Sequence, residues 1–208
     1  MVLPRLYAIV DADMAVRSGW TPRDLARAFL GGGARLLQLR AKTLASGEFL
    51  DMALAIVDDA RRADAHVIVN DRADIAVLSA AAGVHVGQQD LDPEDVRRVV
   101  GTEAAVGLST HSIEQIDGAL ERPISYLAIG PVFSTRTKET GYDRVGLPLV
   151  REAAQRAADK VPVVAIGGIT LDTAARVIQA GAASVAVITD LLAGNPESRV
   201  RQYLSVLA

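Results

Sequence analysis

The sequence predicts a (β/α)8 barrel, and the prediction rests on two observations. Short apolar runs rich in β-branched residues alternate with Ala/Leu/Arg-rich stretches along the chain, as is typical of strands covered on both faces. The 208 residues leave about 26 for each of eight units, enough for a strand, a helix and two short loops. We therefore expect one α/β domain over residues 1–208, built as a TIM barrel. The predicted strands are residues 6–10, 35–39, 67–69, 83–86, 105–108, 126–129, 163–166 and 184–187.

An open, doubly wound parallel sheet is the structural alternative. Such sheets bind ligands in one crevice and often carry a G-x-G-x-x-G loop after the first strand. Here the first predicted strand continues into Val10-Asp11-Ala12-Asp13, and the sequence holds neither that loop nor a Walker A motif. The closed barrel is therefore the preferred prediction.

Helix boundaries are readable between the predicted strands. Thr21 followed by Pro22 is typical of a helix start, and the glycines at 31–33 end that helix. Thr170 begins a later helix, and Gly181 occupies the place of a left-handed exit residue. Another helix opens at residue 46, and its apolar face recurs at spacings of three and four. That face comprises Phe49, Leu50, Ala53, Leu54, Val57 and Ala60.

Composition and charge exclude several classes of protein. With 22 Lys and Arg against 25 Asp and Glu, the net charge of −3 argues against nucleic-acid binding and a polybasic membrane anchor. The absence of cysteine excludes a disulfide scaffold, thiolate metal sites and a cysteine nucleophile. No apolar run reaches the roughly 18 residues of a membrane span, and Asp11 follows the N-terminus too soon for a signal peptide. We expect a cytoplasmic protein without nucleic-acid or membrane partners; its oligomeric state is left open.

Polar residues gather where the predicted strands end. In a (β/α)8 barrel the loops after the strands meet at one face, and this face carries the chemistry. The strings that follow the second to eighth strands are Gln38-Leu39-Arg40-Ala41-Lys42, Asn70-Asp71-Arg72, Gly87-Gln88-Gln89-Asp90, Ser109-Thr110-His111, Ser134-Thr135-Arg136-Thr137-Lys138, Gly167-Gly168 and Ile188-Thr189-Asp190.

Two anionic groups are predicted to bind at this face. Asp71 and Asp90 follow neighbouring strands and offer the oxygen ligands that Mg2+ prefers. The strings after the second and sixth strands add basic side chains, and acids beside bases indicate a polyphosphate held through a metal. The Gly167-Gly168 turn and the turn after the eighth strand occupy the usual phosphate site of such barrels.

Simpler explanations stay open for the same residues. Asp71 could pair with Arg72 or Arg40 rather than with a metal, and Asp90 could help to cap the helix that follows it. The glycine pair could be only a tight turn. His85 lies inside a predicted strand, so we expect a hydrogen-bonded histidine of the core or rim rather than a catalyst.

Taken together, the strings resemble the thiamine phosphate synthase family over essentially the whole chain. Any single string is weak, since Ile-Gly-Gly-Ile occurs in many barrels, but the ordered set is specific. The resemblance implies a Mg2+-dependent transferase acting on small molecules. It would join a hydroxymethylpyrimidine diphosphate to a thiazole phosphate and release diphosphate. The resemblance rests on the stretches 38–42, 70–76, 83–90, 109–111, 130–138 and 165–169.

The resemblance also implies a role for each matching residue. Asp71 and Asp90 would bind Mg2+. The pyrimidine diphosphate would contact Gln38, Leu39, Arg40, Ala41, Lys42, Asn70, Ser109 and Lys138. The thiazole phosphate would contact Thr135, Arg136, Thr137, Gly168, Ile188 and Thr189. The catalytic side chains, which would stabilise charge on the departing diphosphate, are Arg40, Ser109 and Lys138.

Other functions remain as alternatives. A thiazole tautomerase, a similar barrel, would keep the glycine pair but would not need Asp71, Asp90 or the string 135–138. A non-catalytic barrel that binds thiazole phosphate and regulates a partner would have broken metal ligands, whereas both aspartates are intact. Generic phosphate-binding isomerases place a general base such as Glu or His at a strand end, and none of the glutamates lies there.

Overall fold

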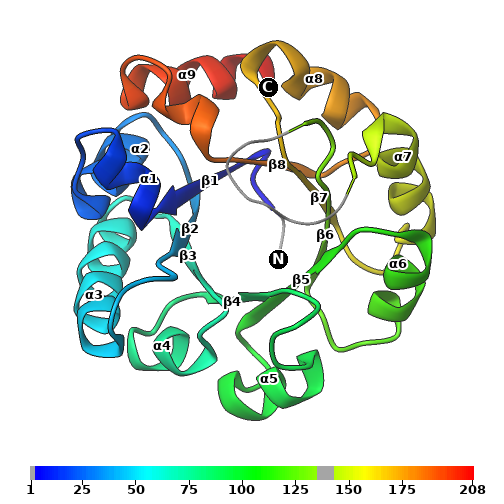
Figure 1. The fold of residues 1–208 in the computed structure, drawn as a ribbon, viewed down its shortest axis with the longest axis horizontal. Helices are drawn as coiled ribbons and strands as arrows, with labels where there is room; N and C mark the ends of the chain where they lie inside the picture. The colour runs from blue at the N-terminus through cyan, green and yellow to red at the C-terminus, as the bar shows by residue number, and fades with distance from the viewer. Residues whose placement is uncertain (1–2, 135–142) are drawn as a thin grey trace.

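Eight parallel strands close into a barrel surrounded by helices, which confirms the predicted fold (Figure 1). The computed structural model describes residues 3–134 and 143–208. Each strand pairs with the next one along the chain, and β8 pairs with β1 to complete the ring. The strands are β1 (Leu6–Asp11), β2 (Leu36–Arg40), β3 (His66–Asn70), β4 (Gly83–Val86), β5 (Ala105–Thr110), β6 (Tyr126–Ile129), β7 (Val163–Ile166) and β8 (Ser184–Val187).

The strands differ from their predicted ranges only at the ends. β1, β2 and β5 extend to the polar residues Asp11, Arg40 and Thr110. Asp11 lies in register with Arg40, and Thr110 with Ile129, so the ladders continue beyond the apolar runs. A hydropathy pattern stops at the first polar residue, whereas backbone hydrogen bonding does not.

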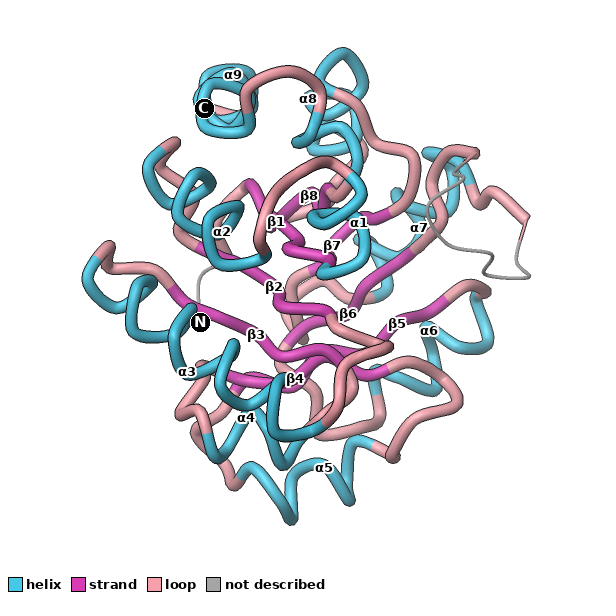
Figure 2. The backbone as a smooth tube through the Cα atoms, turned by 60° about the vertical axis from the view of Figure 1, so that its left-hand side comes forward, coloured by secondary structure: helices cyan, strands magenta, loops and turns pink. Residues whose placement is uncertain are grey.

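Helices form a continuous layer outside the strands (Figures 1 and 2). None of the helices within the described residues is long and apolar enough to cross a membrane. The helices are α1 (Ala12–Arg17), α2 (Pro22–Gly31), α3 (Ser46–Arg62), α4 (Ala73–Leu78), α5 (Pro93–Val100), α6 (Ile113–Leu120), α7 (Gly146–Arg156), α8 (Leu171–Gln179) and α9 (Pro196–Val206), and the short 3-10 helix η1 is Thr189–Leu192.

The predicted helix ends are confirmed where capping residues set them. The Thr21 hydroxyl accepts a hydrogen bond from the Asp24 amide at 3.1 Å and starts α2. Gly181 has a φ of 108° just after α8, and a side chain there would meet the methyl of Ala154. On α3 most of the predicted apolar face is buried, but Leu54 was wrongly included because 44% of it is exposed.

Apolar side chains form two separate layers of core. One layer packs the outward-facing strand residues against the helices. The other fills the barrel and consists almost entirely of strand residues, among them Tyr7, Ile9, Leu36 and Tyr126. Strand side chains alternate between these layers, so consecutive residues at a strand end point to different sides.

A buried carboxylate fastens α2 to α3 on the outside of the barrel. The Asp59 side chain is 7% exposed and accepts hydrogen bonds from Arg23 Nε at 2.7 Å and Arg27 Nε at 3.0 Å. These two guanidinium groups lower the pKa of Asp59 from 3.8 to about 2, in spite of the burial that opposes ionisation.

We predict that Asp59→Asn lowers the free energy of unfolding by about 1–2 kcal/mol at pH 7, allowing for the solvent exposure of both arginines. The folded-state pKa lies below the unfolded one, so this stabilisation is complete above about pH 4 and is lost as the pH falls toward 2. Urea unfolding of wild type and variant at several pH values measures the difference. Asp58→Asn, which removes an exposed neighbour, is the control, and an equal loss in both variants would contradict the prediction.

Candidate functional site

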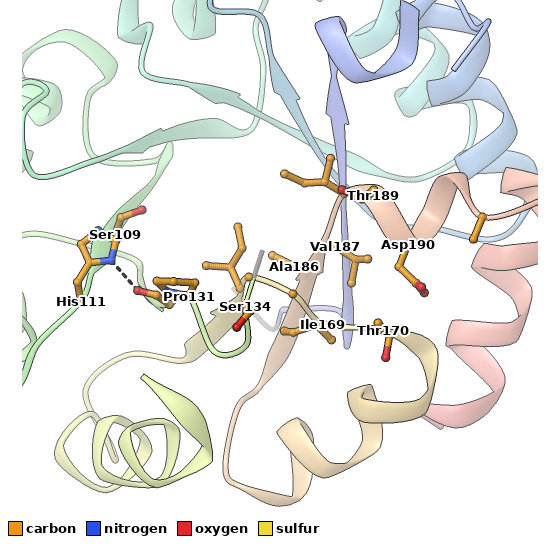
Figure 3. A pocket seen from close by; sticks show the side chains of 16 residues that line it. Ser109, His111, Pro131, Ser134, Ile169, Thr170, Ala186, Val187, Thr189 and Asp190 are labelled. Atoms are coloured by element: carbon orange, nitrogen blue, oxygen red, sulfur yellow. Dashed lines mark hydrogen bonds between the residues drawn. The ribbon is translucent and has the colours of Figure 1, made fainter. Parts of the chain in front are cut away.

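A cavity of about 450 Å3 opens at the carboxyl ends of β5 to β8 (Figure 3). The loops that follow these four strands form its walls, as expected for the functional face of a barrel. Ser109, Gly168, Ile188 and Thr189, all predicted substrate contacts, line it. His111 also lines it, and its Nδ1 lies 2.6 Å from the carbonyl oxygen of Gly130.

The glycine pair after β7 forms one wall of this cavity. Gly167 and Gly168 have φ values of 101° and 64°, in the left-handed region that favours glycine. A Cβ on Gly168 would lie 2.5 Å from the carbonyl oxygen of Ser134, and one on Gly167 would lie 2.5 Å from Cβ of Pro131. The pair is therefore a tight turn, as the simpler explanation held, and it also brings backbone to the cavity surface.

Asp190 joins three elements behind this wall of the cavity. Its Oδ2 accepts hydrogen bonds from the Leu171 amide at 3.1 Å, Arg199 at 2.8 Å and the Tyr203 hydroxyl at 2.6 Å. The carboxylate thereby connects η1, the start of α8 and the C-terminal helix α9. Asp190 thus accepts from one amide at the start of α8 and holds that start against η1 and α9.

On the other side of the mouth, the structure brings Asp71 and Asp90 together. Asp71 has a φ of 62°, and its amide donates to the carbonyl oxygen of His85 at 2.8 Å, which turns it toward the loop after β4. Burial and the charge of Asp90 raise the pKa of Asp71, while Lys42 Nζ, 3.2 Å from Asp71 Oδ2, opposes the rise. Two carboxylates whose charges repel are a suitable place for a cation.

The simpler pairings proposed for these aspartates are wrong. Arg72 pairs with Asp74 at 2.6 Å, and Arg40 pairs with Asp11, so neither holds Asp71. Asp90 accepts from the amide of Gly87 at 2.7 Å instead of capping α5.

The donor set fits Mg2+ better than a metal that needs many protein ligands. Within the described residues, no group of three or more His, Asp or Glu side chains could hold a metal. Mg2+ commonly takes one or two carboxylates, with waters and substrate phosphate oxygens completing its coordination. Asp71 and Asp90 match that requirement, and neighbouring Lys42 adds positive charge for a phosphate.

Asp11 is a site residue that sequence reasoning missed. It is 3% exposed, caps α1 by accepting from the Met14 amide at 3.0 Å, and pairs with the guanidinium of Arg40. Their registered positions at the ends of β1 and β2 bring the two groups together. The sequence carried a signal for this pair, because Asp11 follows the first apolar strand and the basic Arg40 follows the second, which neighbours it in a barrel.

A chain of hydrogen bonds crosses the inside of the barrel just below the mouth. Gln38 Nε2 lies 3.0 Å from the Tyr7 hydroxyl, which lies 3.1 Å from the Tyr126 hydroxyl. The chain continues from Tyr126 to His85 Nδ1 at 3.0 Å and from His85 Nε2 to Ser109 Oγ at 2.8 Å. This confirms the hydrogen-bonded core role of His85.

The remaining predicted contacts divide by the direction of their side chains. Leu39 is fully buried in the layer between strands and helices, so it could meet a ligand only through its backbone. Ala41 and Asn70 are partly buried and Lys42 is exposed at the mouth. Thr135, Arg136, Thr137 and Lys138 lie outside the described residues.

The chain is a (β/α)8 barrel whose mouth carries two neighbouring carboxylates and, over β5 to β8, a glycine-walled cavity. Residues 6–191 match the family described as thiamine monophosphate synthase. The chain belongs to this family, as the resemblance predicted.

Relatives and a solved structure agree with this assignment over nearly the full chain. A thiamine-phosphate synthase of Koribacter versatilis is 45% identical over 207 residues, covering 99% of this chain and 96% of that protein. One from a Roseiflexus species is 38% identical over 204 residues, covering 98% and 85%. The structure of thiamine phosphate pyrophosphorylase from Pyrococcus furiosus superposes with a TM-score of 0.87 at 28% identity, covering 98% and 95%.

We predict that Asp71→Asn weakens Mg2+ binding by about 100-fold, because one of two carboxylates is lost. Asn tolerates the left-handed backbone of this position, so the fold is kept. In the wild type, affinity falls as the pH is lowered, and it does so at a higher pH than for an ordinary Asp, because the pKa of Asp71 is raised. Calorimetric titrations with Mg2+ between about pH 7.5 and 5 measure both effects.

Thermal unfolding without Mg2+ gives a second readout of the same repulsion. A raised folded-state pKa means that the ionised carboxyl destabilises the fold at neutral pH, so Asp71→Asn raises Tm there. The gain disappears as the pH falls through that pKa, where the wild-type carboxyl is also neutral. Asp74→Asn, in the first turn of α4 just after this loop, serves as the control for Mg2+ affinity. Wild-type Mg2+ affinity in Asp71→Asn would exclude Asp71 as a ligand.

Proposed function

We propose that this chain is a Mg2+-dependent thiamine-phosphate synthase. It would join a hydroxymethylpyrimidine diphosphate to a thiazole phosphate and release diphosphate. The observation that carries the proposal is the division of the mouth into two different halves: Asp71, Asp90 and Lys42 on one side, and the glycine-walled cavity on the other. Full-length relatives that carry this name support it.

The diphosphate end of the first substrate belongs at the charged half of the mouth. Arg40 ends β2 and Lys42 follows it, while Ser109 lies near the end of β5 and lines the cavity. Asp11 holds the Arg40 guanidinium in place before any substrate arrives, which lowers the entropic cost of ordering it. Lys138, which lies outside the described residues, completes this set in the proposal.

The thiazole phosphate belongs at the cavity. Gly168, Ile188 and Thr189 line it, and the start of α8 lies behind it. A phosphate held there by backbone amides needs no metal and no carboxylate. The substrate would thus be fixed by its distant phosphate, leaving its ring nitrogen directed toward the pyrimidine. Thr135, Arg136 and Thr137 complete the proposed phosphate contacts.

The reaction requires heterolysis of one C–O bond and formation of one C–N bond. The electron pair of the C–O bond leaves with the diphosphate, and the electron-rich aminopyrimidine stabilises the cation that remains. Arg40, Lys138 and Ser109 stabilise charge growing on the leaving group. Mg2+ held by Asp71 and Asp90 would supply further positive charge to the diphosphate oxygens. The thiazole nitrogen, already positioned, then donates its lone pair to the cation.

A thiazole tautomerase is a weaker candidate on the structure. Such an enzyme would use the cavity alone, and nothing in an isomerisation of a monophosphate calls for two repelling carboxylates. Asp71 and Asp90 lie close enough that the charge of Asp90, together with burial, raises the pKa of Asp71. A regulator that only binds thiazole phosphate would have no use for this pair either.

A coupled synthesis assay tests the proposal directly. Purified protein with both substrates and Mg2+ is expected to form thiamine phosphate and diphosphate, and excess chelator is expected to lower the rate by orders of magnitude. Ser109→Ala is expected to lower kcat by about 100- to 1,000-fold. An equal rate in chelator would refute the metal assignment, and no product under any condition would refute the synthase.

We predict that Gly168→Ala weakens thiazole phosphate binding by about 10-fold or more, because its methyl would displace the carbonyl of Ser134 from the cavity wall. Pyrimidine diphosphate binding should be unchanged. Gly101→Ala is the matched control: it shares a positive φ of 75° but meets nothing within 4 Å, so it carries only the backbone cost. Calorimetric titration of each ligand separates the outcomes, and equal thiazole phosphate affinity in both variants would contradict this site.

A further inference from the structure

The hydrogen-bond chain below the mouth joins two predicted substrate contacts through side chains with no role so far. Gln38 and Ser109 are its ends, and Tyr7, Tyr126 and His85 are its middle. The five residues come from five different strands. The two tyrosines are at most 1% exposed and His85 is 8% exposed, so the middle of the chain is buried.

The barrel leaves room for this chain at one glycine. Gly107 on β5 is in register with His85 on β4 and with Tyr126 on β6. A Cβ at Gly107 would lie 2.1 Å from Tyr126 Cζ and 2.5 Å from His85 Nδ1. The missing side chain lets the tyrosine reach across β5, where its ring stacks on the imidazole with centroids 5.5 Å apart. The contact is therefore built into the packing of three strands.

Counting protons gives the chain a direction. Gln38 Nε2 can only donate, so the Tyr7 oxygen accepts from it, and the Tyr7 proton then goes to Tyr126. Burial raises the pKa of both tyrosines, so both keep their protons. The Tyr126 hydroxyl then donates a hydrogen bond to His85 Nδ1. The imidazole proton is therefore on Nε2, which donates to Ser109 Oγ. The opposite direction requires the Gln38 side-chain amide to be rotated by 180°, so that its Oε1 accepts from Tyr7.

This direction determines what Ser109 offers to a ligand. Because its oxygen already accepts from His85, its own proton remains available to an acceptor at the mouth. An anionic leaving group requires a donor of this kind, and accepting from His85 strengthens the Ser109 hydroxyl as a donor. In the reversed direction the Ser109 hydroxyl would donate its proton to the imidazole. An anion at the mouth would then meet only the lone pairs of the Ser109 oxygen.

We propose that Tyr7, Tyr126 and His85 are positioning residues, which hold Ser109 as a hydrogen-bond donor toward the diphosphate and fix the amide of Gln38. The proposal rests on the synthase function for its ligand. The hydrogen-bond chain does not depend on that function, and its direction can be tested separately.

The first test reads the direction of the chain in the free wild-type protein. The protein has three histidines, and comparison with His85→Gln assigns the 15N resonances of His85. We expect neutral imidazole with the proton on Nε2 and an unprotonated Nδ1, a tautomer that these resonances distinguish directly. A proton on Nδ1 would overturn the direction, whether or not the protein makes thiamine phosphate.

The second test breaks the chain at single atoms. Tyr126→Phe removes one hydroxyl and is expected to lower kcat about 3- to 10-fold, with thiazole phosphate affinity unchanged. His85→Gln places an amide where Nε2 was and keeps the link to Ser109, whereas His85→Asn keeps only the Nδ1 position. We therefore expect His85→Gln to retain more activity than His85→Asn.

Ser184→Ala is the control, because it also removes a buried hydroxyl inside the barrel, one that has no hydrogen-bond partner among the described residues. Wild-type kcat is expected for it. If Tyr126→Phe and His85→Asn match this control while the wild type is active, the positioning role is refuted. If all barrel variants lose kcat and both ligand affinities together, the chain serves folding alone and the proposal is equally refuted.

Discussion

The register of the parallel strands is the constraint on which the site depends. Pairing of Asn70 with His85 places the following residue, Asp71, over the end of β4 and beside the loop that carries Asp90. Pairing of Asp11 with Arg40 likewise places a buried acid beside a mouth cation. A slip of one residue would turn every such side chain to the opposite face, so the packing that fixes the barrel also fixes the chemistry.

The two halves of the mouth are built in different ways. Around β2 to β4, charged side chains face one another, and repulsion between carboxylates is balanced in part by Lys42. Around β7 and β8, backbone and small residues form the wall. Side-chain charge suits a leaving group whose charge grows during reaction, whereas a backbone cradle suits a phosphate whose charge stays constant. Ser109 lies where the halves meet.

The sequence was sufficient for the barrel and for the paired aspartates, because strand alternation and strand-end position are both local patterns. It was not sufficient for Tyr7 and Tyr126, since each counts as an apolar residue within a strand and only closure of the barrel brings their hydroxyls within 3.1 Å. Leu39 shows the converse. It belongs to a contiguous motif, but strand alternation turns its side chain toward the helices.

Asp190 gives the last helix an influence over the cavity at the mouth. One carboxylate binds the start of α8, and it also receives Arg199 and Tyr203 from α9. Helix α9 thus supports the cavity wall. A change that displaced this helix would remove the Arg199 and Tyr203 contacts to Asp190, and with them the support of the cavity wall.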